Sequence, residues 1–224
     1  MSPAARRATI ITVIVAVLAV AAIVITIVAI RAASTSPFVE TAPTPAAASV
    51  LRDDTHVLVD AGPDAPVLVE FLDFECEVCG AFHPIVDDLK ARYGDRVTFA
   101  FRYFPLPGHG NSVTSALAVE AAAQQGALLP MFDRMFETQA QWGERGAESQ
   151  APLFRQYAEE LGLDLALYDA AVADPATLAR IQFDFDEGRA LGVGGTPTFF
   201  LDGEMLQLQE FGDVEAALKQ ALGE

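Results

Sequence analysis

The sequence predicts an α/β domain that begins β–α–β, continues through a run of helices and ends β–β–α, behind one apolar N-terminal segment. Two observations support this prediction. Hydrophobic residues form strand-like runs within residues 67–104, follow a helical period over the next eighty or so residues, and return to strand-like runs after Gly192. A Cys-x-x-Cys pair, Cys76 and Cys79, directly follows the first strand-like run.

The β–α–β unit is predicted from three consecutive segments. Val67–Phe74 is apolar and β-favouring, broken only by Glu70 and Asp73, and indicates a buried strand. Apolar residues then recur at helical spacing to about Tyr93, so a helix should follow the cysteine pair. Val97–Phe104 predicts a second strand, which ends at a Pro-Leu-Pro-Gly sequence.

The remaining elements are predicted from helical stripes, caps and turn residues. Four helices are expected: Ser112–Gln125, one that opens with Pro130, one near Pro152–Leu161, and one from Asp174-Pro175 to just before Gly192. Their Met and Phe stripes indicate core packing rather than a cofactor site. Two strands, Thr198–Leu201 and Met205–Leu208, joined by an Asp202-Gly203 turn, and a helix over Asp213–Leu222 complete the domain.

The apolar segment Ala8–Ile30 contains no charge, proline or glycine. At about 1.5 Å per residue it spans roughly 34 Å, enough to cross a hydrocarbon core of about 30 Å. It is longer than the apolar region of a cleaved signal peptide, so a retained transmembrane helix is expected, although cleavage near Ala32-Ala33-Ser34 stays open. Arg6 and Arg7 outweigh Arg31, which predicts a cytoplasmic N-terminus and a single-pass cell-membrane protein whose domain is extracytoplasmic.

The chain is therefore expected to have five parts. They are a cytoplasmic N-terminus with the anchor (1–31), a flexible tether (32–54), a first half of the α/β domain with the cysteine pair (55–108), a helical insertion (109–191) and a second half (192–224). Small, polar and proline residues over 32–50 are the reason for predicting a tether.

Charge and cysteine count exclude several functions. The net charge is −17 and all 31 acidic residues lie beyond Arg31, so the exported part should repel nucleic acid. Two cysteines are too few for a structural zinc site, and His56, His83 and His109 are not spaced like metal ligands. We therefore expect no metal and no cofactor beyond a redox-active disulfide.

The position of the cysteine pair indicates thiol chemistry. Residues three apart on a first helical turn lie about 5–6 Å apart, close enough for a disulfide. The N–H groups and dipole of the helix N-terminus favour a thiolate, so Cys76 should be the exposed, reactive sulfur and Cys79 the resolving one. Outside the cytoplasm such a pair can persist as a disulfide. A structural clip or two inert buried thiols remain the alternative.

Two motifs resemble the signatures of the DsbA-like thioredoxin-fold disulfide oxidoreductases. They are Phe71-Leu72-Asp73-Phe74-Glu75-Cys76-Glu77-Val78-Cys79 and Gly192-Val193-Gly194-Gly195-Thr196-Pro197-Thr198-Phe199-Phe200. The resemblance covers roughly residues 55 to 222 and implies a thioredoxin-like fold with a helical insertion. It also implies a cis-proline at Pro197 beside the sulfurs, with the backbone of Thr196 free to pair with an extended substrate.

The same resemblance assigns a role to Glu70, six residues before Cys76. The family keeps a buried acid there, which implies a proton acceptor for Cys79 with a pKa raised by burial. The alternative is a strand-edge residue that faces water.

The sequence departs from the best-known family member between the two cysteines. Glu77 and Val78 replace a proline and a thiolate-stabilising histidine, and Asp73, Glu75 and Glu77 add like charge that disfavours a thiolate. We therefore expect a reduction potential between those of DsbA and thioredoxin. His83 is expected to face solvent, whereas His109 lies in a loop that could border the active face.

Three functional hypotheses follow. The leading one is an oxidase that transfers its disulfide to exported cysteine-containing proteins and is reoxidised by a quinone-linked membrane partner, DsbB-like or VKOR-like. The second is a membrane-tethered disulfide reductase or isomerase. The third is a non-enzymatic scaffold or assembly module with an inert disulfide.

Overall fold

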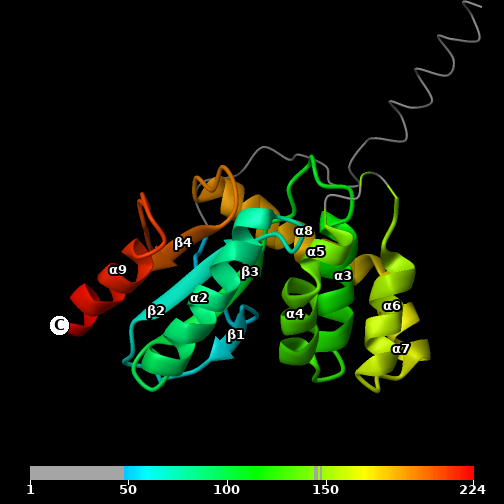
Figure 1. Cartoon of the computed structure of the whole chain (residues 1–224), viewed down its shortest axis with the longest axis horizontal. Coiled ribbons are helices and arrows are strands. Elements are labelled where there is room, and N and C mark those ends of the chain that lie inside the picture. Colours follow the sequence, from blue (N-terminus) through cyan, green and yellow to red (C-terminus); the bar gives the residue numbers. More distant parts are fainter. Residues whose placement is uncertain (1–47, 144–145, 147) are drawn as a thin grey trace, which may run out of the picture. The chain divides into compact units, whose positions relative to one another are not determined.

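A five-stranded mixed sheet forms the centre of the domain (Figure 1). The computed structural model describes residues 48–143, 146 and 148–224. The strands are β1 (His56–Val59), β2 (Val67–Leu72), β3 (Thr98–Tyr103), β4 (Thr198–Leu201) and β5 (Glu204–Met205). They lie in the order β1-β3-β2-β4-β5; β2 and β3 are parallel and the other neighbouring pairs are antiparallel.

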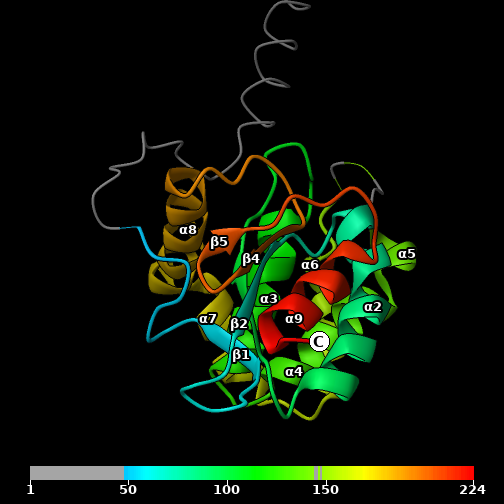
Figure 2. The ribbon, with the colours of Figure 1, turned by 90° about the vertical axis from the view of Figure 1, so that its left-hand side faces the viewer.

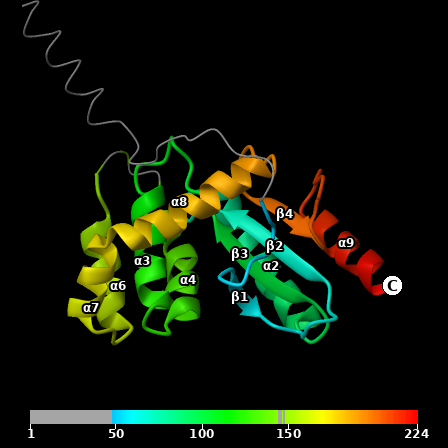
Figure 3. The same cartoon turned by 180° about the vertical axis from the view of Figure 1, so that it is seen from behind.

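Helices cover both faces of the sheet and form a group beside it. They are α2 (Glu77–Tyr93), α3 (Ser112–Ala123), α4 (Leu128–Glu137), α5 (Gln139–Trp142), α6 (Ala151–Glu160), α7 (Leu165–Ala173), α8 (Pro175–Ala190) and α9 (Asp213–Leu222). Figure 2 shows α2 and α9 on one face of the sheet and α8 on the other. Figure 3 shows α8 running from the group of α3, α4, α6 and α7 to the sheet. After the additional strand β1, the order β–α–β, helical insertion, β–β–α confirms the predicted thioredoxin-like arrangement.

The pattern of β2 explains why it is a central strand. Five of its six residues, all but Glu70, are apolar, and it pairs with β3 on one side and β4 on the other. A strand covered on both faces needs apolar side chains in both directions. Phe71, Phe99 and Phe199 are accordingly almost fully buried.

A buried ion cluster fixes α8 against β3. Arg102 is fully buried and donates to Asp184 Oδ1 from Nε at 2.8 Å and from Nη2 at 2.5 Å, and to Glu187 Oε2 at 2.7 Å. Asp184 Oδ2 accepts from Arg180 at 2.7 Å and from the Tyr103 N–H at 3.2 Å. Since charges removed from water need partners, the cluster holds the helical insertion to the sheet in one geometry.

Several predicted boundaries were right, and others were wrong for local reasons. The Asp174-Pro175 start of α8 is confirmed, because Asp174 accepts from the Ala176 N–H at 2.8 Å. Helix α4 begins at Leu128 rather than at Pro130, because proline is tolerated in a first helical turn. Strand β5 ends at Met205, so the predicted strand to Leu208 was too long.

Three short elements were not predicted. Strand β1 has four residues, α5 has four, and α7 lacks one continuous apolar stripe. Each is too short or too uniform to show a period. Helix α7 nevertheless carries a cap, since Asp164 accepts from the N–H groups of Ala166 and Leu167.

The predicted anchor Ala8–Ile30 and residues 32–47 of the predicted tether lie outside the described residues. In the part of the chain that the structure describes, no helix has the length and apolar character needed to cross a bilayer. The membrane topology and the five-part division therefore stay predictions.

Candidate active site

The two cysteines lie at the start of α2, directly after β2. Cys76 is the N-cap residue, with extended backbone angles, and Cys79 lies in the first turn. Both are free thiols; Cys76 is 6 % exposed and Cys79 is 1 % exposed. Cys76 is thus the more accessible sulfur, although the expectation of an openly exposed residue was too strong.

The environment of Cys76 favours its thiolate. Its pKa is lowered to about 6, first by the hydrogen bond from the Cys79 thiol, and further by Thr196 and by the N–H groups of Val78 and Cys79. Burial acts in the opposite direction but does not cancel these hydrogen bonds. An N-cap position presents the unpaired N–H groups of a helix to the sulfur, which is why this cysteine ionises readily.

Cys79 has the opposite character. Burial raises its pKa well above the usual thiol value, and the hydrogen bond to Cys76 and the negative charge of Glu70 raise it further. At neutral pH the reduced pair therefore holds one thiolate and one thiol. This asymmetry provides a nucleophile at Cys76 and a protonated neighbour that can attack only after it loses its proton.

Glu70 lies in the middle of β2, between Phe101 of β3 and Phe199 of β4. It is buried, so the alternative of a strand-edge residue facing water is wrong. Burial raises the pKa of its carboxyl to about 8; the negative charge of Cys76 adds to the rise and Lys90 opposes it. Glu70 is thus largely protonated at neutral pH, and its role as proton acceptor for Cys79 stays a prediction.

The second of the two sequence motifs, residues 192–200, contacts the first, residues 71–79, at Cys76. The Cys76 thiol donates to the carbonyl oxygen of Thr196 at 3.3 Å, although the two residues are 120 positions apart. The Thr196–Pro197 peptide bond is cis, as the resemblance implies. Thr196 and Pro197 are both partly exposed, so an approaching chain can reach this edge. Their part in substrate binding stays a prediction.

The acidic residues near Cys76 are not free charges. Asp73 is buried and accepts from the Glu75 N–H at 2.9 Å, the Leu106 N–H at 2.9 Å and His109 Nδ1 at 2.7 Å. Glu75 is buried too and accepts from the Asn111 N–H at 2.6 Å. The loop between β3 and α3 is therefore held against the turn that carries Cys76, and His109 does border the site.

Gln139, on α5, is a site residue that the sequence did not indicate. Its Nε2 donates to the carbonyl oxygens of Phe74 at 2.7 Å and Cys76 at 2.8 Å. Its Oε1 lies only 2.0 Å from where a Cβ of Gly80 would be, so any side chain at position 80 would displace the Gln139 amide. The only sequence signal was Gly80, whose missing side chain leaves room for another residue, but the sequence alone does not show that this residue is Gln139.

The prediction that His83 faces solvent was wrong, because its side chain is only 11 % exposed. Its ring stacks on Phe136 with centroids 4.9 Å apart, and burial lowers its pKa. The side chains of His83, Asp87 and Asp133 each bring an atom that could bind a metal ion, and these atoms lie within 4.8 Å of one another. The sequence did not indicate this group, because Asp133 lies on α4, far along the chain from the other two. Lys90 Nζ lies 2.6 Å from Asp87 Oδ1 and already supplies a positive charge there.

Comparison with protein families identifies the domain. The model of the family described as Thioredoxin matches residues 59–220, which is most of the chain. Among curated proteins, a Na(+)/H(+) antiporter NhaA from Herminiimonas arsenicoxydans is 37 % identical over 140 residues, covering 62 % of this chain and 21 % of the relative. The chain spans only about a quarter of the length of the curated relatives it matches.

Solved structures show the same fold. α-DsbA1 from Wolbachia pipientis aligns with a TM-score of 0.65 at 19 % identity, covering 78 % of this chain and 94 % of that one. Oxidised BdbD from Bacillus subtilis aligns with a TM-score of 0.65 at 17 % identity, covering 84 % of this chain and all of that one. The likeness includes the helical insertion, since nearly the whole of each of these chains is covered.

Proposed function

Because the chain belongs to the thioredoxin family, we propose that it is a thiol–disulfide oxidoreductase that works by exchange at Cys76 and Cys79. The observation that carries this proposal is the asymmetry of the pair. The pKa of Cys76 is lowered to about 6, whereas that of Cys79 is raised well above the usual thiol value. An inert structural clip needs no such difference, but exchange needs one sulfur that attacks or leaves easily and one that resolves.

The low pKa of Cys76 favours the oxidase direction. A client thiolate attacks the Cys76 sulfur of the oxidised pair, the S–S bond breaks, and Cys79 leaves and takes up a proton. A second client thiolate then attacks the client sulfur of the mixed disulfide, and the Cys76 thiolate leaves with the electron pair. The client is oxidised, the pair is reduced, and a low-pKa thiolate is the better leaving group in the second step.

Glu70 is suited to handle the proton in the first step. Its carboxyl is largely protonated at neutral pH, and its charge acts on Cys79. A proton released by Glu70 would neutralise the leaving Cys79, and the reverse transfer would activate Cys79 when the mixed disulfide is resolved.

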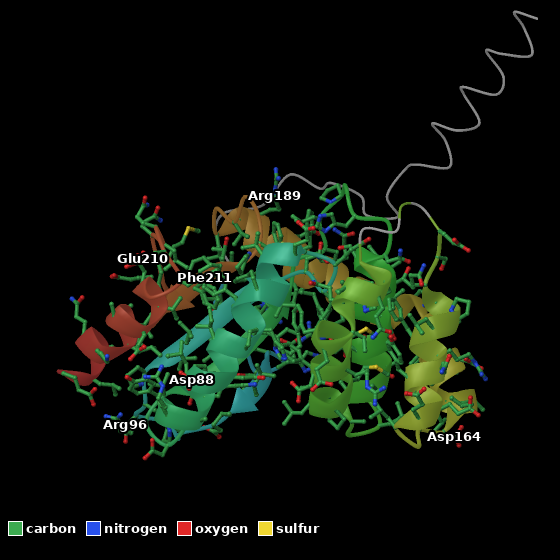
Figure 4. The ribbon with its side chains drawn as sticks, viewed as in Figure 1. Asp88, Arg96, Asp164, Arg189, Glu210 and Phe211 are labelled. Atoms are coloured by element: carbon green, nitrogen blue, oxygen red, sulfur yellow. The ribbon has the colours of Figure 1, made fainter. Side chains whose placement is uncertain are left out.

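Exposed apolar side chains near the site support proteins as the substrates. Val78, between the cysteines, is 49 % exposed and Phe211 is 47 % exposed. The Phe211 ring packs on Phe82 of α2, with centroids 4.6 Å apart, and Figure 4 shows Phe211 on the α2 side of the loop before α9. Incompletely folded proteins expose both apolar segments and thiols, so cysteine-containing exported proteins fit this surface.

We propose further that the domain works on the extracytoplasmic side of the cell membrane, held there by Ala8–Ile30. Support comes from the length of that apolar segment and from the basic residues before it. A tether raises the effective concentration of the domain near a membrane partner, which favours a quinone-linked, DsbB-like or VKOR-like reoxidant. The redox-active disulfide is the one cofactor that the mechanism requires.

A reductase or isomerase is the second candidate, favoured by the exposed acidic Glu77 between the cysteines. The test uses the full-length protein, oxidised beforehand, and a reduced client with two disulfides. Stoichiometric disulfide transfer without added reductant supports the oxidase. Activity only in the presence of a reductant would replace the oxidase by this candidate. If Cys76 resists both mild reduction and alkylation, the site is inert and a scaffold role replaces both enzymes.

Client trapping gives a sharper picture of the exchange. A Cys79→Ala variant should accumulate mixed disulfides through Cys76, because the resolving thiol is missing. The matched Cys76→Ala variant keeps only Cys79, whose thiol is less accessible and has a raised pKa, and should trap no clients. Equal trapping by the two variants would contradict the assignment of roles.

A further inference from the structure

The turn that carries Cys76 also contains a buried carboxylate, Asp73, whose negative charge disfavours a thiolate at Cys76. Asp73 comes three residues before Cys76 and is buried, and its backbone carbonyl accepts from the Cys76 N–H at 3.1 Å. A buried carboxylate in the same turn as a sulfur opposes ionisation of that sulfur unless a positive charge compensates it. The hydrogen bonds from Cys79, Thr196 and the helix N–H groups favour the Cys76 thiolate, and a cation paired with Asp73 would favour it further.

His109 is the side chain that reaches Asp73. Its Nδ1 lies 2.7 Å from Asp73 Oδ2, the oxygen that also accepts from the Leu106 N–H. The imidazole is about three-quarters buried. Its exposed part can exchange protons with solvent, and its buried part brings its charge to Asp73 where little water screens the interaction. The other buried acid of the turn, Glu75, accepts from the backbone of Asn111, which is neutral.

The electrostatic surroundings favour the charged form of His109. Its pKa is raised, first by the hydrogen bond to Asp73 and then by the negative charges of Asp73, Glu75 and Cys76, with burial acting in the opposite direction. The thiolate of Cys76 is one of these charges, and a charge interaction acts equally on both partners. An imidazolium that a thiolate stabilises therefore also stabilises that thiolate.

We propose that His109 is a positioning residue for the Cys76 thiolate: carried by the β3–α3 loop and held by Asp73, it cancels the carboxylate charge beside the reactive sulfur. The two residues between the cysteines, Glu77 and Val78, offer no cation, so this charge arrives from a separate loop. This inference deepens the proposed function and rests on it. It explains how an acidic turn still supports a nucleophilic cysteine.

The test is a titration of the Cys76 thiolate in the reduced full-length protein, followed by its ultraviolet absorbance. His109→Asn keeps an N–H donor toward Asp73 and removes the positive charge. We expect the Cys76 pKa to rise by about one unit, the size of effect expected when a neighbouring opposite charge is lost. His83→Asn is the matched control; His83 packs on Phe136 rather than on Asp73, and its replacement should leave the Cys76 pKa unchanged.

A double-mutant cycle separates charge cancellation from a structural role. Asp73 is the main cause of the raised His109 pKa, so in an Asp73→Asn background His109 should lose its charge. His109→Asn should therefore raise the Cys76 pKa while Asp73 is present and have little effect in the Asp73→Asn background. An unchanged Cys76 pKa in His109→Asn, or equal shifts in both backgrounds, would overturn the inference. If Cys76 already titrates like an ordinary thiol in the unmodified protein, it is the proposed function that fails.

Discussion

The sulfur of Cys76 lies 3.3 Å from the carbonyl oxygen of Thr196, so the two halves of the thioredoxin-like domain meet at the reactive atom. The hydroxyl oxygen of Thr196 is buried as well and has no hydrogen-bond partner in the described part of the structure. A buried hydroxyl without a partner is costly, and a thiolate beside it is a strong acceptor. A hydrogen bond from this hydroxyl to the Cys76 thiolate would satisfy the hydroxyl, and it is one of the interactions that lower the Cys76 pKa.

Thr196→Val should raise the pKa of Cys76 by about half a unit to one unit, because the valine cannot donate to the thiolate. The measurement is the pH dependence of the alkylation rate of the reduced full-length protein, which follows the thiolate fraction. Thr198→Val is the matched control, since the Thr198 hydroxyl donates to the Gly195 carbonyl at 2.8 Å. Identical alkylation profiles for Thr196→Val and the unmodified protein would contradict this role.

Glu70→Gln should change how stability depends on pH. The pKa of Glu70 is raised to about 8 in the folded protein, above its value in the unfolded chain. Its favourable contribution is therefore complete below about pH 4.5 and is lost as pH rises through 8. The variant should remove this loss, which at about 1.4 kcal/mol per pKa unit amounts to at most roughly 5 kcal/mol by pH 9.

Urea unfolding of the reduced protein at pH 5 and pH 9 measures this effect. Glu204→Gln is the control, because Glu204 is exposed on β5 of the same sheet. The free energy of unfolding should fall between these pH values in the control and the unmodified protein, and fall less in Glu70→Gln. Parallel pH profiles for all three proteins would show that Glu70 does not titrate as described.

Much of the fold could be predicted because its main elements carry their own signals. Strand β2 is a nearly unbroken apolar run, and α8 begins with a capping aspartate and a first-turn proline. Strand β1 and helix α5, with four residues each, are specified by the partners they pack against rather than by a period of their own. Such elements cannot be derived from local patterns.

The active site, like the fold, has residues that could be predicted from the sequence and residues that could not. Cys76 and Cys79 could be assigned from their spacing at a strand-to-helix junction, and Pro197 from the second motif. His109 and Gln139 could not, because each reaches the cysteine turn from a loop or helix whose position depends on the whole fold. Charges counted along the sequence also mislead here, since Asp73 is buried and paired with His109.

Arg102→Ala should destabilise the domain strongly. It removes the one fully buried cation of the cluster between β3 and α8 and leaves Asp184 with Arg180 and Glu187 with Arg52; removing one partner of a buried ion pair costs about 3–5 kcal/mol. Chemical denaturation at one fixed redox state measures the loss. Arg155→Ala is the control: its ion pair with Asp169 is exposed and should contribute less than about 1 kcal/mol.

Gly80→Ala and Gln139→Ala should be strongly coupled. A Cβ on Gly80 would lie 2.0 Å from Gln139 Oε1, so the substitution must displace the amide that donates to the carbonyl oxygens of Phe74 and Cys76. Overpacking of this kind costs about 1–3 kcal/mol. In the Gln139→Ala background the space is open, and alanine in a helix is favoured over glycine by about 1 kcal/mol.

Gly80→Ala should therefore destabilise the unmodified protein and stabilise the Gln139→Ala variant, a change of sign that urea denaturation of the four proteins resolves. The same cycle, read by the alkylation rate of Cys76, reports on the active-site turn. If Gln139 positions that turn, Gly80→Ala and Gln139→Ala each alter the rate and their combination alters it no further. Additive free energies in the four proteins would mean that Gly80 and Gln139 do not compete for the same space.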